Sequence, residues 1–83
     1  MKKTYLVYTE KYGRIDERTT ERTYTHAVVR IGSNGHIHRP EYCGSKALAD
    51  KKAATYLRPT VSYGDTFPAF DGQVFVTEIA EIN

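Results

Sequence analysis

An 83-residue chain can bury one modest hydrophobic core and is too short for two, so a single compact domain over residues 1–83 is expected. Hydrophobic residues make up 40% of the sequence and charged residues 27%, which argues against wholesale disorder. The single cysteine cannot form an intramolecular disulfide, and no apolar run approaches the roughly 20 residues of a membrane span or the core of a signal peptide. These features predict a soluble protein of the reducing cytoplasm.

The net charge of +2 is unevenly distributed along the chain. All twelve Lys and Arg residues lie at or before Arg58, and the four acids of residues 59–83 face no base in that part of the sequence. Such asymmetry can produce a bipolar surface that steers a charged partner. Alternatively, acidic and basic strands lie side by side and their fields cancel.

The first half of the chain has the pattern of strands. Residues 4–10 are rich in β-branched and aromatic side chains and predict a strand, and the charge-mixed residues 14–23 predict a solvated hairpin arm or loop. Residues 24–31 predict a second strand, with one face formed by Thr25, Ala27, Val29 and Ile31. The Gly-Ser-Asn-Gly sequence of residues 32–35 favours a type I′ hairpin turn, and a third strand is expected over residues 36–39.

One helix is expected in the second half, over residues 45–58. Ser45 is a good N-cap, the alanines favour helix, and Pro59 ends it. Its packing face is expected to contain Ala49, Ala53, Tyr56 and Leu57, with Leu48 at the edge. Residues 60–72 are expected to form a loop and residues 73–82 the last strand. The order β-β-β-α-β predicts an α+β fold, an antiparallel sheet of about four strands with one helix packed on one face.

The sequence offers little support for catalysis or for a metal. His36 and His38 are two residues apart on an expected strand, so both would project from the same face and could join His26 around a metal. The tight paired ligand spacings of structural zinc sites are absent, however. Cys43 precedes the helix without a partner that would activate it. The segment from His36 to Pro40 is similar to the histidine strand of small messenger-RNA-cleaving toxins, which implies a nuclease with His36 or His38 as acid or base. In that family a helix precedes this strand, whereas here strands do. We therefore expect no enzyme, no metal and no cofactor.

Basic residues suggest nucleic-acid contact, although lysines on a helix more often mark a solvated face. The candidate phosphate-contacting residues are Lys46, Lys51, Lys52 and Arg58 on the helix and Arg30, His36, His38 and Arg39 on the hairpin.

Two resemblances bear on function. Residues 25–32, the hairpin, Gly44-Ser45-Lys46 and the alanine-spaced helix are similar to the hairpin-plus-helix half of a double-stranded-RNA-binding domain. This resemblance implies phosphate binding by lysines of the first helical turn, a place held here by Lys46. The strand Tyr-Thr-His-Ala-Val-Val and the Ser-initiated helix also resemble small phage-encoded α+β proteins, among them anti-CRISPR and other anti-defence inhibitors. That resemblance implies a non-catalytic binder that occludes a host protein or ribonucleoprotein complex.

The loop over residues 60–72 is rich in aromatic residues, which either anchor an interface or fold back over the small core. The residues expected to contact a protein partner are Arg14, Arg18, Tyr63, Phe67 and Phe70. The leading hypothesis is thus a cytoplasmic inhibitor of a host nucleic-acid-processing complex, with no membrane association and acting as a monomer or dimer. The alternative is a nucleic-acid binder that uses the basic helix face.

Overall fold

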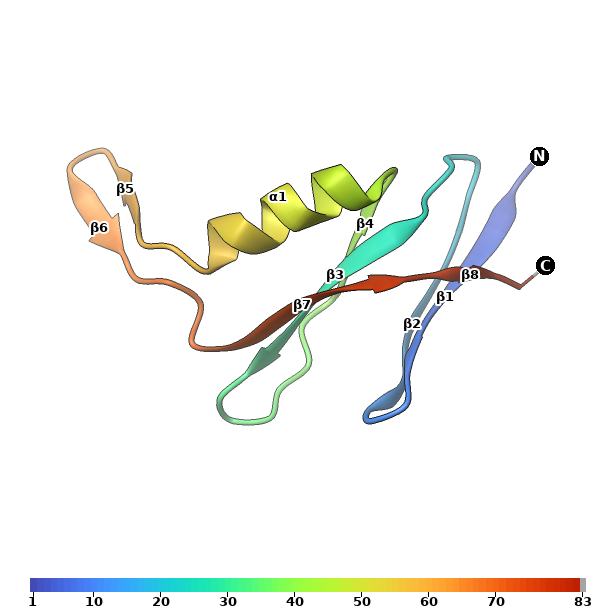
Figure 1. The fold of residues 1–83 in the computed structure, drawn as a ribbon, viewed down its shortest axis with the longest axis horizontal. Coiled ribbons are helices and arrows are strands. Elements are labelled where there is room, and N and C mark those ends of the chain that lie inside the picture. The colour runs from blue at the N-terminus through green and yellow to red at the C-terminus, as the bar shows by residue number, and fades with distance from the viewer. Residues whose placement is uncertain (83) are drawn as a thin grey trace.

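The computed structural model describes residues 1–82 and confirms a small α+β fold with one helix among antiparallel strands (Figure 1). The elements are β1 (Lys3–Thr9), β2 (Gly13–Thr20), β3 (His26–Gly32), β4 (Glu41–Cys43), α1 (Lys46–Tyr56), β5 (Thr60–Ser62), β6 (Asp65–Phe67), β7 (Gly72–Glu78) and β8 (Ala80–Glu81). No helix in this part of the chain is both long and apolar enough to cross a membrane.

The strands form three sheets, with orders β2-β1-β8, β4-β3-β7 and β5-β6. The C-terminal segment links the first two sheets, because β7 pairs with β3 whereas β8, two residues further on, pairs with β1. The N–H of Ile79, between these strands, donates to the carbonyl of Thr25 at 3.2 Å. The strand predicted over residues 73–82 therefore forms, but as two strands, β7 and β8, that belong to different sheets.

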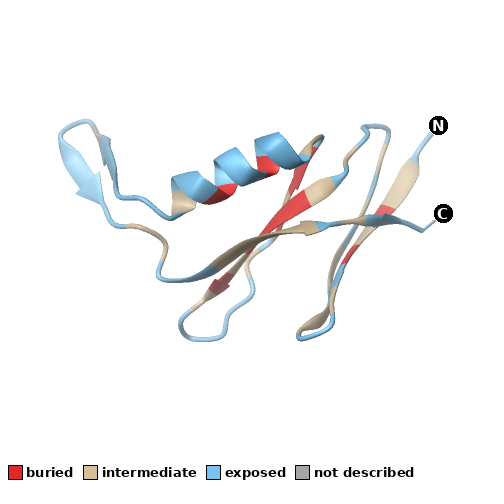
Figure 2. Ribbon diagram, viewed as in Figure 1, coloured by how far each residue is buried: buried red, intermediate tan, exposed pale blue. Residues whose placement is uncertain are grey.

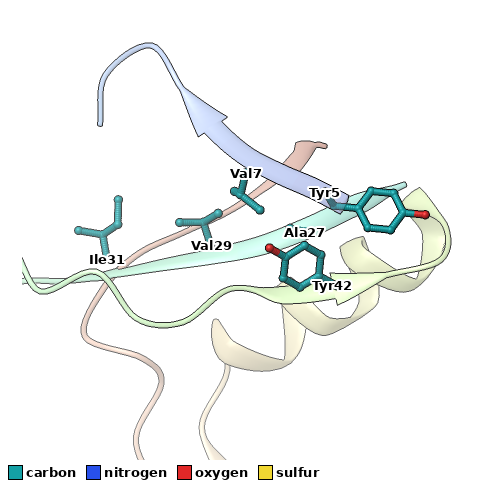
Figure 3. Packing of buried hydrophobic residues seen from close by; sticks show 6 residues of the cluster. All are labelled: Tyr5, Val7, Ala27, Val29, Ile31 and Tyr42. Carbon is teal, nitrogen blue, oxygen red and sulfur yellow. The ribbon is translucent and has the colours of Figure 1, made fainter. Parts of the chain in front are cut away.

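β3 is buried on both faces and lies at the centre of the molecule (Figure 2). Ala27, Val29 and Ile31 pack against Tyr5 and Val7 of β1 (Figure 3). Val28 points to the opposite face and packs against α1. The result is three layers, with α1 on one face of the β4-β3-β7 sheet and the β2-β1-β8 sheet on the other. The predicted alternation of faces along this strand is correct.

Local signals determine α1. The side chain of Ser45 accepts a hydrogen bond from the N–H of Leu48 at 3.2 Å, as expected of an N-cap. Ala49 and Ala53 are buried against the sheet, where their small side chains allow close approach of the helix. Leu57 was expected on this face, but it is 56% exposed because the helix ends at Tyr56.

The expected strand over residues 36–39 is wrong. Only Ile37 bridges to Ile31, and the strand that pairs with β3 is β4, beyond Pro40. The turn before it is not type I′ either, because within residues 32–35 only Gly35 has a positive φ (87°). The carbonyl of Gly32 accepts from the N–H of Gly35 at 2.8 Å, which describes a type I turn followed by a left-handed glycine. After this three-residue connection the returning chain makes one isolated bridge to β3, at Ile37, and pairs regularly with β3 only from Glu41 onward.

Strands also form in two further segments, one expected as a hairpin arm or loop and the other as a loop. Of the alternatives for residues 14–23, the hairpin holds, since β2 pairs with β1 along its whole length. Residues 60–72 contain the β5–β6 hairpin, whose turn residues Tyr63 and Gly64 both have positive φ, at 53° and 82°. This is the backbone of a type I′ turn.

Candidate functional site

The β5–β6 hairpin, residues 60–67, forms an arm that projects beyond the end of α1 (Figure 1). Its two strands pair with each other, and the two hydrophobic core clusters contain none of the residues of these strands whose burial is described, Thr60, Val61 and 65–67. Three apolar or aromatic side chains of the arm are exposed, Val61 at 71%, Tyr63 at 103% and Phe67 at 53%. The predicted partner residues Tyr63 and Phe67 therefore belong to one projecting element, with Tyr63 in its turn and Phe67 at its base, opposite Thr60.

Phe70 has a different position from these two. It is half-buried where the arm joins the body, and its N–H donates to the carbonyl of Tyr56 at 2.8 Å. Its ring meets the ring of His38 edge-on, with centroids 5.2 Å apart. The aromatic residues were expected either to fold back over the core or to anchor an interface. Phe70 folds back over the body, whereas Tyr63 and Phe67 are exposed and available for contact.

Arg14 and Arg18 lie on opposite faces of β2. Arg18 is opposite the buried Tyr5, whereas Arg14 is opposite the exposed Tyr8, beyond an irregularity in the register of β1 and β2. Arg14 forms an ion pair with Glu17 on the surface. Arg18 reaches across to the second sheet. The two predicted partner residues therefore do not share a surface.

The basic residues of the nucleic-acid hypothesis are also separated. Lys46 pairs with Asp50 at 2.9 Å on the helix surface. Lys51 is exposed on the side of α1 away from Ala49, whereas Lys52 faces β4, with its Nζ 3.9 Å from Glu41 Oε2. Arg58 is exposed beyond the helix end.

The remaining members of that set lie between β3 and β4. The rings of His36 and His38 are 4.9 Å apart, with His36 exposed and His38 half-buried. Arg39 is exposed and turns toward β2 and Lys52. Of the predicted phosphate contacts, Arg30, Arg39 and Lys52 line one hollow.

These three residues line part of a groove that the sequence did not reveal. Two adjoining hollows of about 550 and 400 Å³ lie between β2, β4 and α1, and Arg18 and Arg39 line both of them. We call them together the arginine groove. Its basic side chains are Arg18, Arg22, Arg30, Arg39 and Lys52, and its acidic ones are Glu17 and Glu41.

Tyrosine rings support two of these arginines. The guanidinium carbon of Arg18 lies 4.6 Å from the centre of the Tyr42 ring, and that of Arg30 lies 4.5 Å from the centre of the Tyr56 ring. Such stacking is favourable by roughly 0.5–2 kcal/mol, depending on solvent access. The rings therefore fix the direction in which the two guanidinium groups point.

The same tyrosines engage nearby carboxylates. The Tyr42 hydroxyl donates to Asp16 Oδ2 at 2.7 Å, and the Tyr56 hydroxyl donates to Glu41 Oε1 at 2.6 Å. Burial, together with these hydrogen bonds, raises the pKa of both tyrosine hydroxyls, so both remain donors at neutral pH. Two acids that could otherwise neutralise the arginines are thus held by tyrosines.

Neither a metal-ligand cluster nor an exposed thiol is found in residues 1–82. Within residues 1–82, no three His, Cys, Asp or Glu side chains converge as a metal site would require. Cys43 is buried, and burial raises the pKa of its thiol, which disfavours the reactive thiolate.

Comparison with known proteins adds no relative to this picture. No family model matches the chain, and neither a curated protein nor a solved structure shows significant similarity to it.

Proposed function

We propose that this chain is a non-catalytic binding protein that docks on a partner protein through the β5–β6 arm. The observation that carries the proposal is the fully exposed Tyr63 at the tip of the arm, together with the exposed Val61 and Phe67 on the two faces of the same hairpin. Aromatic residues that fill a pocket on a partner are typical anchors of protein interfaces.

The stability of the arm supports this role. An isolated two-stranded hairpin is marginally stable in water, and three-residue strands give it few backbone hydrogen bonds. A partner that covers Tyr63 and one face of the hairpin, with either Val61 or Phe67, would bury apolar area and stabilise the hairpin at once. The arm therefore has the properties of an element that is completed by binding.

The backbone conformation of Tyr63 also supports docking through the arm. A bulky non-glycine residue at a φ of 53° adopts a conformation that costs about 1 kcal/mol or more, and asparagine or glycine would tolerate it better. A tyrosine in this strained conformation at an exposed tip is consistent with a role for its side chain in contact.

The class of partner follows from the resemblance to small anti-defence proteins. We propose a host protein or ribonucleoprotein complex that processes nucleic acid, which this protein would inhibit by occluding a working surface. No step of catalysis is required of the chain, and inhibition would be stoichiometric.

The test is quantitative capture of host proteins on the immobilised chain. We expect a specific protein to be retained by the wild type and lost with Tyr63→Ser or Phe67→Ser, at unchanged thermal stability of the body. Tyr8→Ser is the matched control, because Tyr8 is also an exposed tyrosine (56%) but lies on β1, outside the arm. Equal capture by the wild type and both arm variants would refute docking through the arm.

A further inference from the structure

We propose that the arginine groove binds the phosphate backbone of a nucleic acid. The groove is made by residues far apart in the sequence: Arg18 from β2, Arg22 after β2, Arg30 from β3, Arg39 before β4 and Lys52 from α1. Five basic side chains and two acidic ones line the groove, so its formal charge of +3 exceeds the +2 of the whole chain and is concentrated in one region.

The arginines of the groove are not neutralised by the protein. Within residues 1–82, Arg18, Arg22, Arg30 and Arg39 form no ion pair. By contrast, Arg14, on the other face of β2, pairs with Glu17. The groove therefore offers guanidinium groups whose hydrogen-bonding capacity toward an anion is unused.

Two of these groups are fixed before any ligand arrives. Arg18 stacks on Tyr42 and Arg30 on Tyr56, and Phe70 contributes a second ring, 5.9 Å from the guanidinium carbon of Arg30. In residues 1–82 the buried Nε of Arg30 has no hydrogen-bond partner, so the rings rather than a carboxylate position this side chain. Pre-ordered side chains lose less conformational entropy on binding.

The chemistry of the groove favours phosphate groups over other anions. A guanidinium group binds phosphate through two parallel hydrogen bonds, and a row of such groups suits a ligand whose negative charge repeats along its length. Tyr42 and Tyr56 already stack with arginines, so these rings are not free to stack with bases. We therefore expect binding that depends on the backbone and tolerates any base sequence.

The topology leaves the groove open when the arm is occupied. β2 and β4 are edge strands of their sheets, and the arm lies beyond the far end of α1 (Figure 1). Binding at the groove is thus independent of the proposed docking of a protein at the arm, and each can fail without the other.

The experiment is a fluorescence anisotropy titration of short labelled DNA and RNA oligonucleotides, single-stranded and duplex, against the full chain. We expect dissociation constants in the range of about 1–100 μM at low salt. If four basic groups contact phosphates, raising salt from about 50 to 200 mM should weaken binding roughly 50- to 150-fold. The comparison of single strands with duplexes shows which form the groove accepts.

Two double variants with the same net charge separate the groove from the rest of the surface. Arg22→Ala with Arg39→Ala removes two exposed groove arginines, and we expect about tenfold or greater loss of affinity and a shallower salt dependence. Arg14→Ala with Lys51→Ala removes two basic groups outside the groove and should change affinity less than threefold. Thermal unfolding of each variant verifies that the fold is retained.

Three results would overturn the proposal. The first is no binding of any oligonucleotide at low salt. The second is equal weakening by the two double variants, which would mean that overall charge rather than the groove attracts the ligand. The third is tighter binding of a labelled oligo-glutamate peptide than of any oligonucleotide, which would assign the groove to an acidic protein segment.

Discussion

At the scale of single residues, His38 combines burial with positive neighbours. Its N–H donates to the carbonyl of Arg30 at 2.9 Å, and its ring lies between those of His36 and Phe70. Burial, and to a lesser extent the charges of Arg30 and His36, lower the pKa of His38 below its usual value of 6.5. The folded state therefore favours the neutral imidazole of His38 over the protonated one.

This lowered pKa predicts a pH dependence of stability. The unfolded chain binds the proton more tightly than the folded one, so the contribution of His38 is fully present above pH 6.5 and is lost as the pH falls through the folded pKa. We expect the melting temperature to fall less between pH 7.5 and 5.5 in His38→Gln than in the wild type. His26→Gln is the control, and an unchanged pH dependence in His38→Gln would contradict the assignment.

At the scale of elements, the contact between α1 and the sheet depends on small side chains. Ala49 is fully buried between α1 and β3, whereas Ala54, on the same helix, is exposed. We expect Ala49→Leu to lower the free energy of unfolding by about 1–3 kcal/mol, because the added atoms must push the helix off the sheet. Ala54→Leu should change it by less than about 0.5 kcal/mol. Urea denaturation of both variants is the measurement, and equal effects would show that the helix does not pack closely.

The elements that could be predicted from the sequence are those with local causes. α1 follows from the Ser45 cap, the alanines and Pro59, and β3 follows from its strict alternation. β4 has only three residues, and it forms because β3 offers an edge, which is a tertiary cause. The type I′ turn was expected at Asn34-Gly35 but forms at Tyr63-Gly64, since strand pairing on both sides of a turn decides its type.

The candidate sites likewise divide into features with a local signal in the sequence and features that depend on tertiary packing. Exposure of Tyr63 and Phe67 could be foreseen as one of two alternatives, because polar and glycine residues surround them in the sequence. The arginine groove could not be predicted, since it joins Arg22 and Arg39 across the gap between two sheets. Arg22 gave no signal beyond its charge, and the role of Tyr42 as a platform for Arg18 depends on the packing of β4 against β2.

At the scale of the whole molecule, acids lie near the arginine groove as well as away from it. β2 and β4, which border the arginine groove, are edge strands, and β8 and β7 are the opposite edges of the same two sheets. Glu78 and Glu81 lie on β7 and β8, away from the groove, but β2 also carries Asp16 and Glu17, and β4 carries Glu41. The positive charge of the groove is therefore local, and the sheet orders do not divide the molecule into a basic and an acidic side.

The two sheets are held together partly by one polar contact, which makes a prediction for the whole fold. Tyr42 of β4 is 8% exposed, and its hydroxyl donates to Asp16 of β2 at 2.7 Å. Tyr42→Phe removes this hydrogen bond to a charged group and leaves the half-buried carboxylate without that donor. We expect the free energy of unfolding to fall by about 1.5–3 kcal/mol, measured by urea denaturation.

The matched control is Tyr8→Phe, because Tyr8 is exposed on β1 and its hydroxyl makes no contact between the sheets. The phenylalanine ring in Tyr42→Phe still offers a face to Arg18, so the folded variant should keep its affinity for oligonucleotides. A large loss of stability with retained binding would assign the hydroxyl to joining the sheets and the ring to orienting the arginine. Equal stability of the two variants would show that apolar packing alone, through Tyr5, Val7 and Val29, holds the sheets together.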